Sequence, residues 1–259
     1  MSERVRTKVE GRIAEVRLDA PEKHNVLDRE GWHALAAVMH ELSARADLGC
    51  VVVRGSGGRA FSAGSDISTF AVQRDTLEDV RVYADAIAGA MHAVRDCLHP
   101  TLAIIEGLCV GGGLEIAACC DVRICEASSR FGAPINRLGL TMSHGELQPL
   151  LALLGPGTVL EILLTGDLMD ADHALRVGLV NRVVAEGRGA AAGFEIAKRI
   201  ASGAPLVNRW HKKFIRRLAD PTPLSDAERH EAFEAFGTAD YREGRTAFLE
   251  KRDPDFRGE

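Results

Sequence analysis

Two short apolar segments that each run into a glycine cluster constrain the fold of this chain more than any other feature. Cys50 to Val53 precedes the turn Gly55 to Gly58, and Thr101 to Ile105 precedes Gly111 to Gly113. The second cluster is followed directly by LEIAACC, which is compatible with a helix. A strand, a loop with exposed backbone and a helix N-terminus, in this order, favour the binding of a negatively charged oxygen.

The first two thirds of the chain alternate between strand-like and helix-like segments. Ile13 to Leu18 alternates apolar and polar residues as a half-buried strand does, and Asp28 to Ala46 carries apolar residues at helical spacing. The strand signals stop near Ala190, and Phe194 to Phe256 is typical of three or four helices separated by prolines. We therefore predict an α/β fold, with a boundary near residue 200 between residues 1–200 and a helical region, 201–259.

Composition describes an ordinary globular protein. The chain has 259 residues, 46% of them hydrophobic, and a formal net charge of −5, which argues against nucleic acid or an anionic membrane as a partner. The polar start of the sequence and the lack of an uninterrupted apolar run of about 18 residues predict neither a signal peptide nor a membrane span. Six cysteines without a C-x-x-C pair predict reduced thiols and a cytoplasmic location.

Several familiar site motifs are absent. The spacing of Gly107 and Gly111 to Gly113 fits neither G-x-G-x-x-G nor the P-loop, so a nucleotide cofactor is not predicted. Ala60 to Gly64 approaches a nucleophile elbow, but Ala60 replaces its first glycine. No pair of histidines at i, i+4 with a nearby glutamate occurs, so we predict no metal.

Six segments together resemble the crotonase, or enoyl-CoA hydratase/isomerase, superfamily, and the likeness covers about residues 10 to 256. They are PEKHNVLD (21–28), GRAFSAGSDI (58–67), IEGLCVGGGLEIAACCDVRIC (105–125), FGAPINRLGL (131–140), ALRVGLVNRVV (174–184) and GRTAFLEKRDPDF (244–256). The resemblance implies a spiral of ββα repeats followed by a C-terminal helical trimerisation region. It also implies an acyl-CoA thioester as substrate, with no cofactor beyond the CoA moiety, and a homotrimer or dimer of trimers.

By the same resemblance, two backbone N–H groups hold the thioester oxygen as it becomes an enolate, and they belong to Ser65 and Gly112. Glycine allows a close approach of the main chain, and the helix N-terminus beside Gly112 favours negative charge. The resemblance further assigns the CoA moiety to Lys23, His24, Ala63, Asp66, Phe248 and Lys251. Asp66 has an alternative role as a cap that braces its loop, and Phe248 and Lys251 would approach the nucleotide end of CoA from a neighbouring subunit.

The acid/base residues are only partly those of a typical hydratase. Glu115 corresponds to one catalytic glutamate of the family and would carry a proton at the substrate, aided by a pKa raised through desolvation. The second glutamate would fall at position 135, which is Ile135 here. Asn136, Ser143, His144 and Glu146 lie nearby, and His144 or Glu146 is a candidate for the missing acid or base.

Three functions follow from these residues. The leading hypothesis is hydration or double-bond isomerisation of an enoyl-CoA, with Glu115 as the proton carrier. The alternatives are another reaction on the same fold, such as decarboxylation or thioester hydrolysis, and acyl-CoA binding without catalysis.

Overall fold

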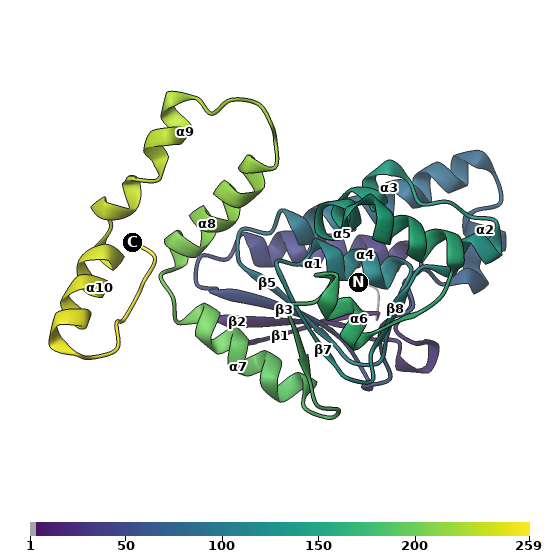
Figure 1. Ribbon diagram of the computed structural model, residues 1–259, viewed down its shortest axis with the longest axis horizontal. Helices are drawn as coiled ribbons and strands as arrows, with labels where there is room; N and C mark the ends of the chain where they lie inside the picture. The colour runs from purple at the N-terminus through teal and green to yellow at the C-terminus, as the bar shows by residue number, and fades with distance from the viewer. Residues whose placement is uncertain (1–3) are drawn as a thin grey trace.

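The computed structural model describes residues 4–259 as two β-sheets with helices packed around them (Figure 1). Within these residues the larger sheet has six strands in the order β1-β2-β3-β5-β7-β10. β1 pairs antiparallel with β2, and the remaining pairs are parallel. The strands are β1 (Val5–Glu10), β2 (Ile13–Leu18), β3 (Cys50–Gly55), β5 (Thr101–Ile105), β7 (Val122–Glu126) and β10 (Arg182–Val184).

A smaller sheet has the order β4-β6-β8-β9, and its strands are β4 (Ala60–Ser62), β6 (Leu108–Val110), β8 (Arg130–Gly132) and β9 (Met169–Asp170). Consecutive strands alternate between the sheets, because β3, β5 and β7 lie in the larger sheet whereas β4, β6 and β8 lie in the smaller one. Helices follow each such pair. The chain therefore winds as repeated ββα turns, which confirms the predicted α/β spiral.

Different helices cover the two faces of the larger sheet, because alternate residues of a strand point to opposite faces. Val51 and Val53 of β3 join the main core with α1 and α3, whereas Cys50 and Val52 join a smaller core with α7. The helices of this region are α1 (Arg29–Ser43), α2 (Phe70–Gln73), α3 (Leu77–Arg95), α4 (Gly112–Cys119), α5 (His144–Thr165), α6 (Ala171–Arg176) and α7 (Gly189–Ala201).

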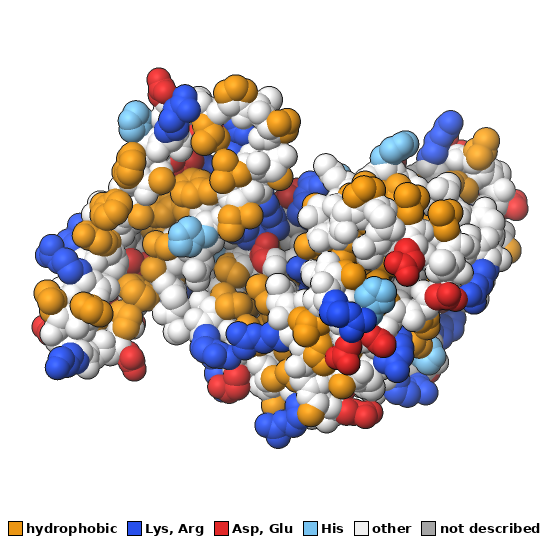
Figure 2. Space-filling view, viewed as in Figure 1, with side chains coloured by type: hydrophobic (Ala, Val, Ile, Leu, Met, Phe, Trp, Pro, Cys, Tyr) orange, Lys and Arg blue, Asp and Glu red, His pale blue; other side chains and the backbone are white. Residues whose placement is uncertain are grey.

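The last helices, α8 (Pro205–Leu218), α9 (Asp226–Glu231) and α10 (Ala239–Glu250), extend from the sheets as an arm (Figure 1). Asp121 anchors α8, since its carboxylate pairs with Lys212 at 2.7 Å and with Arg216 at 2.9 Å. Figure 2 shows apolar side chains gathered over the arm, and the most exposed are Ile215, Leu218, Phe233, Phe236, Phe248 and Leu249. The link between α7 and α8 lies near the boundary expected at residue 200, and the division into two domains stays a prediction.

Helix α5 is the element relevant to the predicted absence of a membrane span. It is long and apolar enough, by length and composition, to cross a membrane, and little of its surface is covered in this structure. Gly155, at φ +71°, interrupts its helical geometry. Its buried residues Leu150, Val159 and Ile162 pack into the main core. The expectation that the protein has no membrane partner stays a prediction.

Candidate active site

The loop that follows β4 meets the N-terminus of α4 through two glycines. Gly64 has φ +85°, and a Cβ at this position would lie 2.5 Å from the backbone nitrogen of Gly112. A Cβ at Gly112 would lie 2.9 Å from the ring of Trp32, which is fully buried beneath it. Both positions therefore require glycine, for conformation at Gly64 and for space at both.

The backbone amides of Ser65 and Gly112 are free to bind a ligand. Leu27 and Ser65 form an isolated parallel β-bridge. Its two hydrogen bonds run from the Leu27 N–H to the Gly64 carbonyl and from the Asp66 N–H to the Leu27 carbonyl, both at 2.8 Å, so neither uses the Ser65 amide. Gly112 begins α4, where an amide has no partner within the helix. Within residues 4–259 neither amide donates a hydrogen bond, and both residues line one cavity.

Buried polar groups hold the Ser65 loop in place. Asn25 donates to the carbonyls of Ser56 and Ala60, and Ser62 donates to the Asn25 carbonyl at 2.8 Å. The Ser62 hydroxyl in turn accepts from the amide of Gly64 at 3.0 Å. These bonds satisfy groups that would otherwise be costly to bury, and they fix the backbone on the strand side of Ser65.

Asp66 fixes the other side of Ser65. Its carboxylate accepts from the backbone N–H of Ser68 and from the side chains of Ser68, Lys23 and Arg4. Burial opposes its ionisation, but these hydrogen bonds prevail and lower the pKa of Asp66 to about 2. The carboxylate therefore braces the loop, as the capping alternative predicted.

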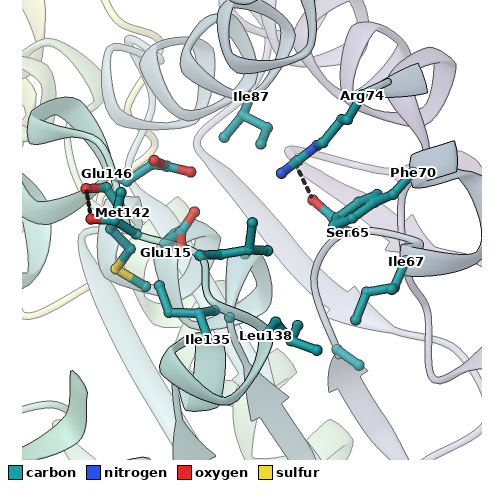
Figure 3. A pocket seen from close by; sticks show the side chains of 15 residues that line it. Ser65, Ile67, Phe70, Arg74, Ile87, Glu115, Ile135, Leu138, Met142 and Glu146 are labelled. Atoms are coloured by element: carbon teal, nitrogen blue, oxygen red, sulfur yellow. Dashed lines mark hydrogen bonds between the residues drawn. The ribbon is translucent and has the colours of Figure 1, made fainter. Parts of the chain in front are cut away.

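The cavity beside the two amides encloses about 540 Å³ when its open mouth is included. Most of its side chains are apolar, and three are charged: Arg74, Glu115 and Glu146 (Figure 3). The apolar side chains are those of Ala63, Ile67, Phe70, Ile87, Ile135, Leu138, Leu140 and Met142. Such a surface suits a short acyl chain next to a thioester.

Glu115 lies one turn into α4, close to the Gly112 amide. Its side chain is buried, and its Oε2 has no hydrogen-bond partner in the described chain. Burial raises the pKa of its carboxyl well above the ordinary value of 4.5, the Glu146 carboxylate adds to this rise, and the Arg74 guanidinium opposes it. A protonated carboxyl beside the cavity is suited to give a proton to a bound molecule.

Glu146 is the candidate that the structure brings to the same cavity. It forms a capping box at the start of α5, in which the Ser143 N–H donates to Glu146 Oε2 at 2.6 Å. Ile135 also lines the cavity, so an aliphatic side chain stands at the position that the resemblance assigns to a second glutamate. Two carboxyl groups, Glu115 and Glu146, therefore face one cavity (Figure 3).

The other candidates near Ile135 serve the local structure. His144 is exposed at the first turn of α5 and does not line the cavity. Asn136 donates to the Leu164 carbonyl at 3.0 Å, and Ser143 caps α5. The structure therefore does not bring His144 to the site.

The residues assigned to CoA lie in two places. Lys23 pairs with Asp66 at 3.0 Å, and the His24 carbonyl accepts from the amide of Ala63 at 2.9 Å, so these residues flank the Ser65 loop. Phe248 and Lys251 lie at the exposed end of α10, in the arm, far from the cavity of their own chain (Figure 1). Their contact with a CoA bound to a neighbouring copy stays a prediction.

Arg74 is a residue of the cavity that sequence reasoning did not find. Its guanidinium carbon lies 4.1 Å from the ring centroid of Phe70 and 3.9 Å from that of Tyr83, and Nη2 donates to Ser65 Oγ at 3.3 Å. Its Nε is buried without a hydrogen-bond partner, and within residues 4–259 Arg74 forms no ion pair. No motif surrounds position 74, so only the fold connects it with Ser65.

No group of three or more His, Cys, Asp or Glu residues that could hold a metal ion occurs among residues 4–259. The cavity presents two free amides, two carboxyl groups and one guanidinium.

Known proteins resemble this chain over most of its length. The model of the family described as "Enoyl-CoA hydratase/isomerase" matches residues 8–259. The short-chain-enoyl-CoA hydratase of Clostridium acetobutylicum is 33% identical over 247 residues, which cover 94% of this chain and 93% of that protein. The carnitinyl-CoA dehydratase of Citrobacter koseri is 31% identical over the full length of both chains. A crystal structure of an enoyl-CoA hydratase/carnithine racemase from Magnetospirillum magneticum is 44% identical, with a TM-score of 0.97 over 100% of this chain and 97% of that one.

Proposed function

Because the chain belongs to the enoyl-CoA hydratase/isomerase family of the crotonase superfamily, and so is an enzyme of the hydratase/isomerase type, we propose that it adds water to the α,β double bond of a short enoyl-CoA. The observation that carries this proposal is the placement of two free amides and two carboxyl groups around one cavity. Similar proteins named short-chain-enoyl-CoA hydratase and crotonyl-CoA hydratase support the substrate class.

The Ser65 and Gly112 amides bind the thioester oxygen in this proposal. Water attack at the β carbon moves an electron pair onto that oxygen and forms an enolate. Two fixed N–H donors stabilise this charge without having to reorient, and the N-terminus of α4 adds a favourable dipole. The loss of one such donor typically lowers the rate by about 10²- to 10³-fold.

Glu146 and Glu115 act as base and acid. Glu146 accepts a proton from the attacking water, while the protonated Glu115 gives its proton to the α carbon of the enolate. The product is a β-hydroxyacyl-CoA, and a proton then returns from Glu146 to Glu115 through solvent. Burial of Glu115 next to a second carboxyl keeps the proton where the enolate needs it.

The surroundings of the site support further parts of this proposal. In this proposal Lys23, His24 and Ala63, which flank the Ser65 loop, bind the CoA moiety, and Asp66 acts by holding that loop. The exposed apolar surface of the arm and of α5 fits a homotrimer or dimer of trimers, in which Phe248 and Lys251 reach a neighbouring CoA. The six buried, free cysteines of the described chain fit a reducing cytoplasm.

A direct test is the hydration of crotonyl-CoA, followed as the loss of enoyl absorbance. We expect turnover by the wild type and a loss of about 10²- to 10⁴-fold in kcat for Glu146→Gln, which keeps the shape of the side chain but not its basicity. Glu161→Gln, on the exposed side of the same helix, is the matched control and should be unchanged. Equal activity of Glu146→Gln and wild type would remove Glu146 from the mechanism.

Isomerisation is the second candidate, and Ile135 favours it. If the ionised form of Glu115 takes the α proton of a 3-enoyl-CoA and returns it to the γ carbon of the dienolate, one carboxyl group suffices and no water needs to be activated. Conversion of 3-enoyl-CoA into 2-enoyl-CoA at a rate unaffected by Glu146→Gln would support isomerisation over hydration.

A further inference from the structure

The charge of Arg74 is not balanced by any carboxylate contact in the described chain, although it lies in the cavity that holds the acyl chain. Figure 3 shows its guanidinium pointing into the cavity, opposite Glu115 and Glu146. Its protein partners are the Ser65 hydroxyl and two aromatic rings, and Nε has no partner. A guanidinium in such surroundings favours an anion, and its planar fork matches a carboxylate.

The surrounding residues hold this guanidinium in position. The Tyr83 ring is fully buried, its hydroxyl donates to the Leu27 carbonyl at 3.1 Å, and it meets the Phe70 ring edge-on at 6.0 Å. Both rings lie against the guanidinium, which restricts its orientation. Less side-chain freedom is then lost when a ligand binds, as in a preorganised site.

The other side chains of the cavity give an acyl carboxylate no second cation. Apart from Arg74, the described lining consists of apolar side chains, two glutamates, Ser65 and Thr141, and backbone. A carboxylate placed there without Arg74 would be desolvated and unpaired, which is costly. An apolar acyl chain would in turn leave the guanidinium without a carboxylate in hydrogen-bond contact.

We propose that Arg74 binds a carboxylate on the acyl chain, so that the preferred substrates are short enoyl-CoA thioesters carrying a second carboxyl group beyond the double bond. This inference rests on the proposed function, because it places the thioester oxygen at the Ser65 and Gly112 amides. Arg74 Nη2 lies 3.3 Å from Ser65 Oγ, so the second carboxylate lies only a few bonds from the thioester carbonyl.

The two glutamates are compatible with an anionic substrate. Neither forms an ion pair with Arg74 in the described chain, and the Ser143 N–H engages Glu146. Burial raises the pKa of Glu115, which favours its uncharged form and weakens any repulsion of the ligand. Arg74 therefore stays available for the substrate.

Glutaconyl-CoA and 2-pentenoyl-CoA test this proposal, because they differ only in that a carboxylate replaces the terminal methyl group. We expect the wild type to have the higher kcat/KM for glutaconyl-CoA. Arg74→Gln should lower that value by about 10- to 100-fold more than it lowers the value for 2-pentenoyl-CoA. Arg74→Lys keeps the charge without the fork and should recover part of the loss. Arg81→Gln, on the exposed face of α3, is the control and should leave both values unchanged.

Binding of the saturated analogues separates this inference from the proposed reaction. Glutaryl-CoA should bind more tightly than pentanoyl-CoA by calorimetry, and Arg74→Gln should remove the difference. If this result is obtained while neither enoyl-CoA is hydrated, the carboxylate site stands and the proposed reaction fails. The inference is wrong if the wild type binds glutaryl-CoA and pentanoyl-CoA equally tightly. It is also wrong if Arg74→Gln weakens the binding of both ligands equally, because Arg74 then does not bind the acyl carboxylate.

Discussion

Two parts of the cavity lining differ in the groups that they present. One side, which we call the amide wall, consists of residues 62–66 and 111–113, is largely buried and presents backbone N–H groups. The other, the side-chain wall, consists of residues 134–146 and presents side chains from a more exposed segment. A backbone amide is the same in every residue except proline, whereas a side chain changes with each substitution. Substitutions in the side-chain wall can therefore change the chemistry of the cavity while the two free amides stay in place.

Glu115 projects from α4, the helix that starts in the amide wall. Its replacement is expected to have the largest effect on activity and so tests the comparison of the two walls most strongly. Glu115→Gln should lower kcat for crotonyl-CoA by on the order of 10³- to 10⁴-fold, because the amide cannot transfer a proton. The check is steady-state kinetics, with tight binding of a saturated acyl-CoA retained. Loss of binding together with turnover would instead make Glu115 a structural residue.

The same variant should gain stability at neutral pH. Since the folded state raises the pKa of Glu115 above 4.5, the unfolded state releases this proton first as the pH rises, and the wild type loses stability above that pH. Urea unfolding from pH 4 to pH 8 should show the free energy of unfolding of Glu115→Gln rising relative to wild type.

Gly64→Ala tests the amide wall itself. The new Cβ would lie 2.5 Å from the Gly112 nitrogen, so the loop must shift and one donor is displaced. We expect kcat to fall by on the order of 10²- to 10³-fold. Gly58→Ala is the matched control, because Gly58 also has a positive φ but a Cβ there meets nothing within 4 Å. If kcat fell equally in the two variants, the loss in Gly64→Ala would be due to backbone strain and not to a displaced donor.

Ile135→Glu tests whether the side-chain wall accepts new chemistry. A glutamate there faces the cavity beside Glu115 and Glu146, and we expect hydration to rise by about 2- to 10-fold if it can orient water. Product analysis by chromatography checks that the added activity is hydration. If the hydration rate of Ile135→Glu were unchanged or lower, a single substitution in the side-chain wall would not be enough to change the chemistry of the cavity.

Asp66→Asn should have the smallest effect, and it acts on stability. The pKa of Asp66 falls from 3.8 to about 2 on folding, so its stabilisation is present above pH 4 and is lost as the pH falls towards 2. Relative to wild type, Asp66→Asn should be destabilised by on the order of 1 kcal/mol at pH 6 and by less at pH 3. Urea midpoints check this, with the exposed Asp85→Asn as the control.

The sequence predicted the amide wall better than the side-chain wall. Cys50 to Val53 and Thr101 to Ile105 are strands as expected, and the glycines at 64 and 112 mark places where backbones touch. These positions can be predicted from the sequence because steric contacts allow only glycine there. The prediction of free amides at Ser65 and Gly112 is consistent with the hydrogen bonds of the described chain.

The side-chain wall depends on contacts that spacing does not encode. The sequence offered His144 and Glu146 on equal terms, and only the direction of the first turn of α5 distinguishes them. Arg74 and Asn25 escaped notice for a related reason. Each acts on the Ser65 loop from a distant segment, Arg74 through the Ser65 hydroxyl and Asn25 through the carbonyls of Ser56 and Ala60.

Because the buried Trp32 ring lies beneath Gly112, tryptophan fluorescence can report on the amide wall. The chain has two tryptophans, and the other, Trp210, lies in α8. In a Trp210→Phe background, all indole emission would come from the ring next to Gly112, whose amide we propose as a ligand of the thioester oxygen. Ligand arrival could then be timed by stopped-flow fluorescence without a label and separated from the slower loss of the double bond.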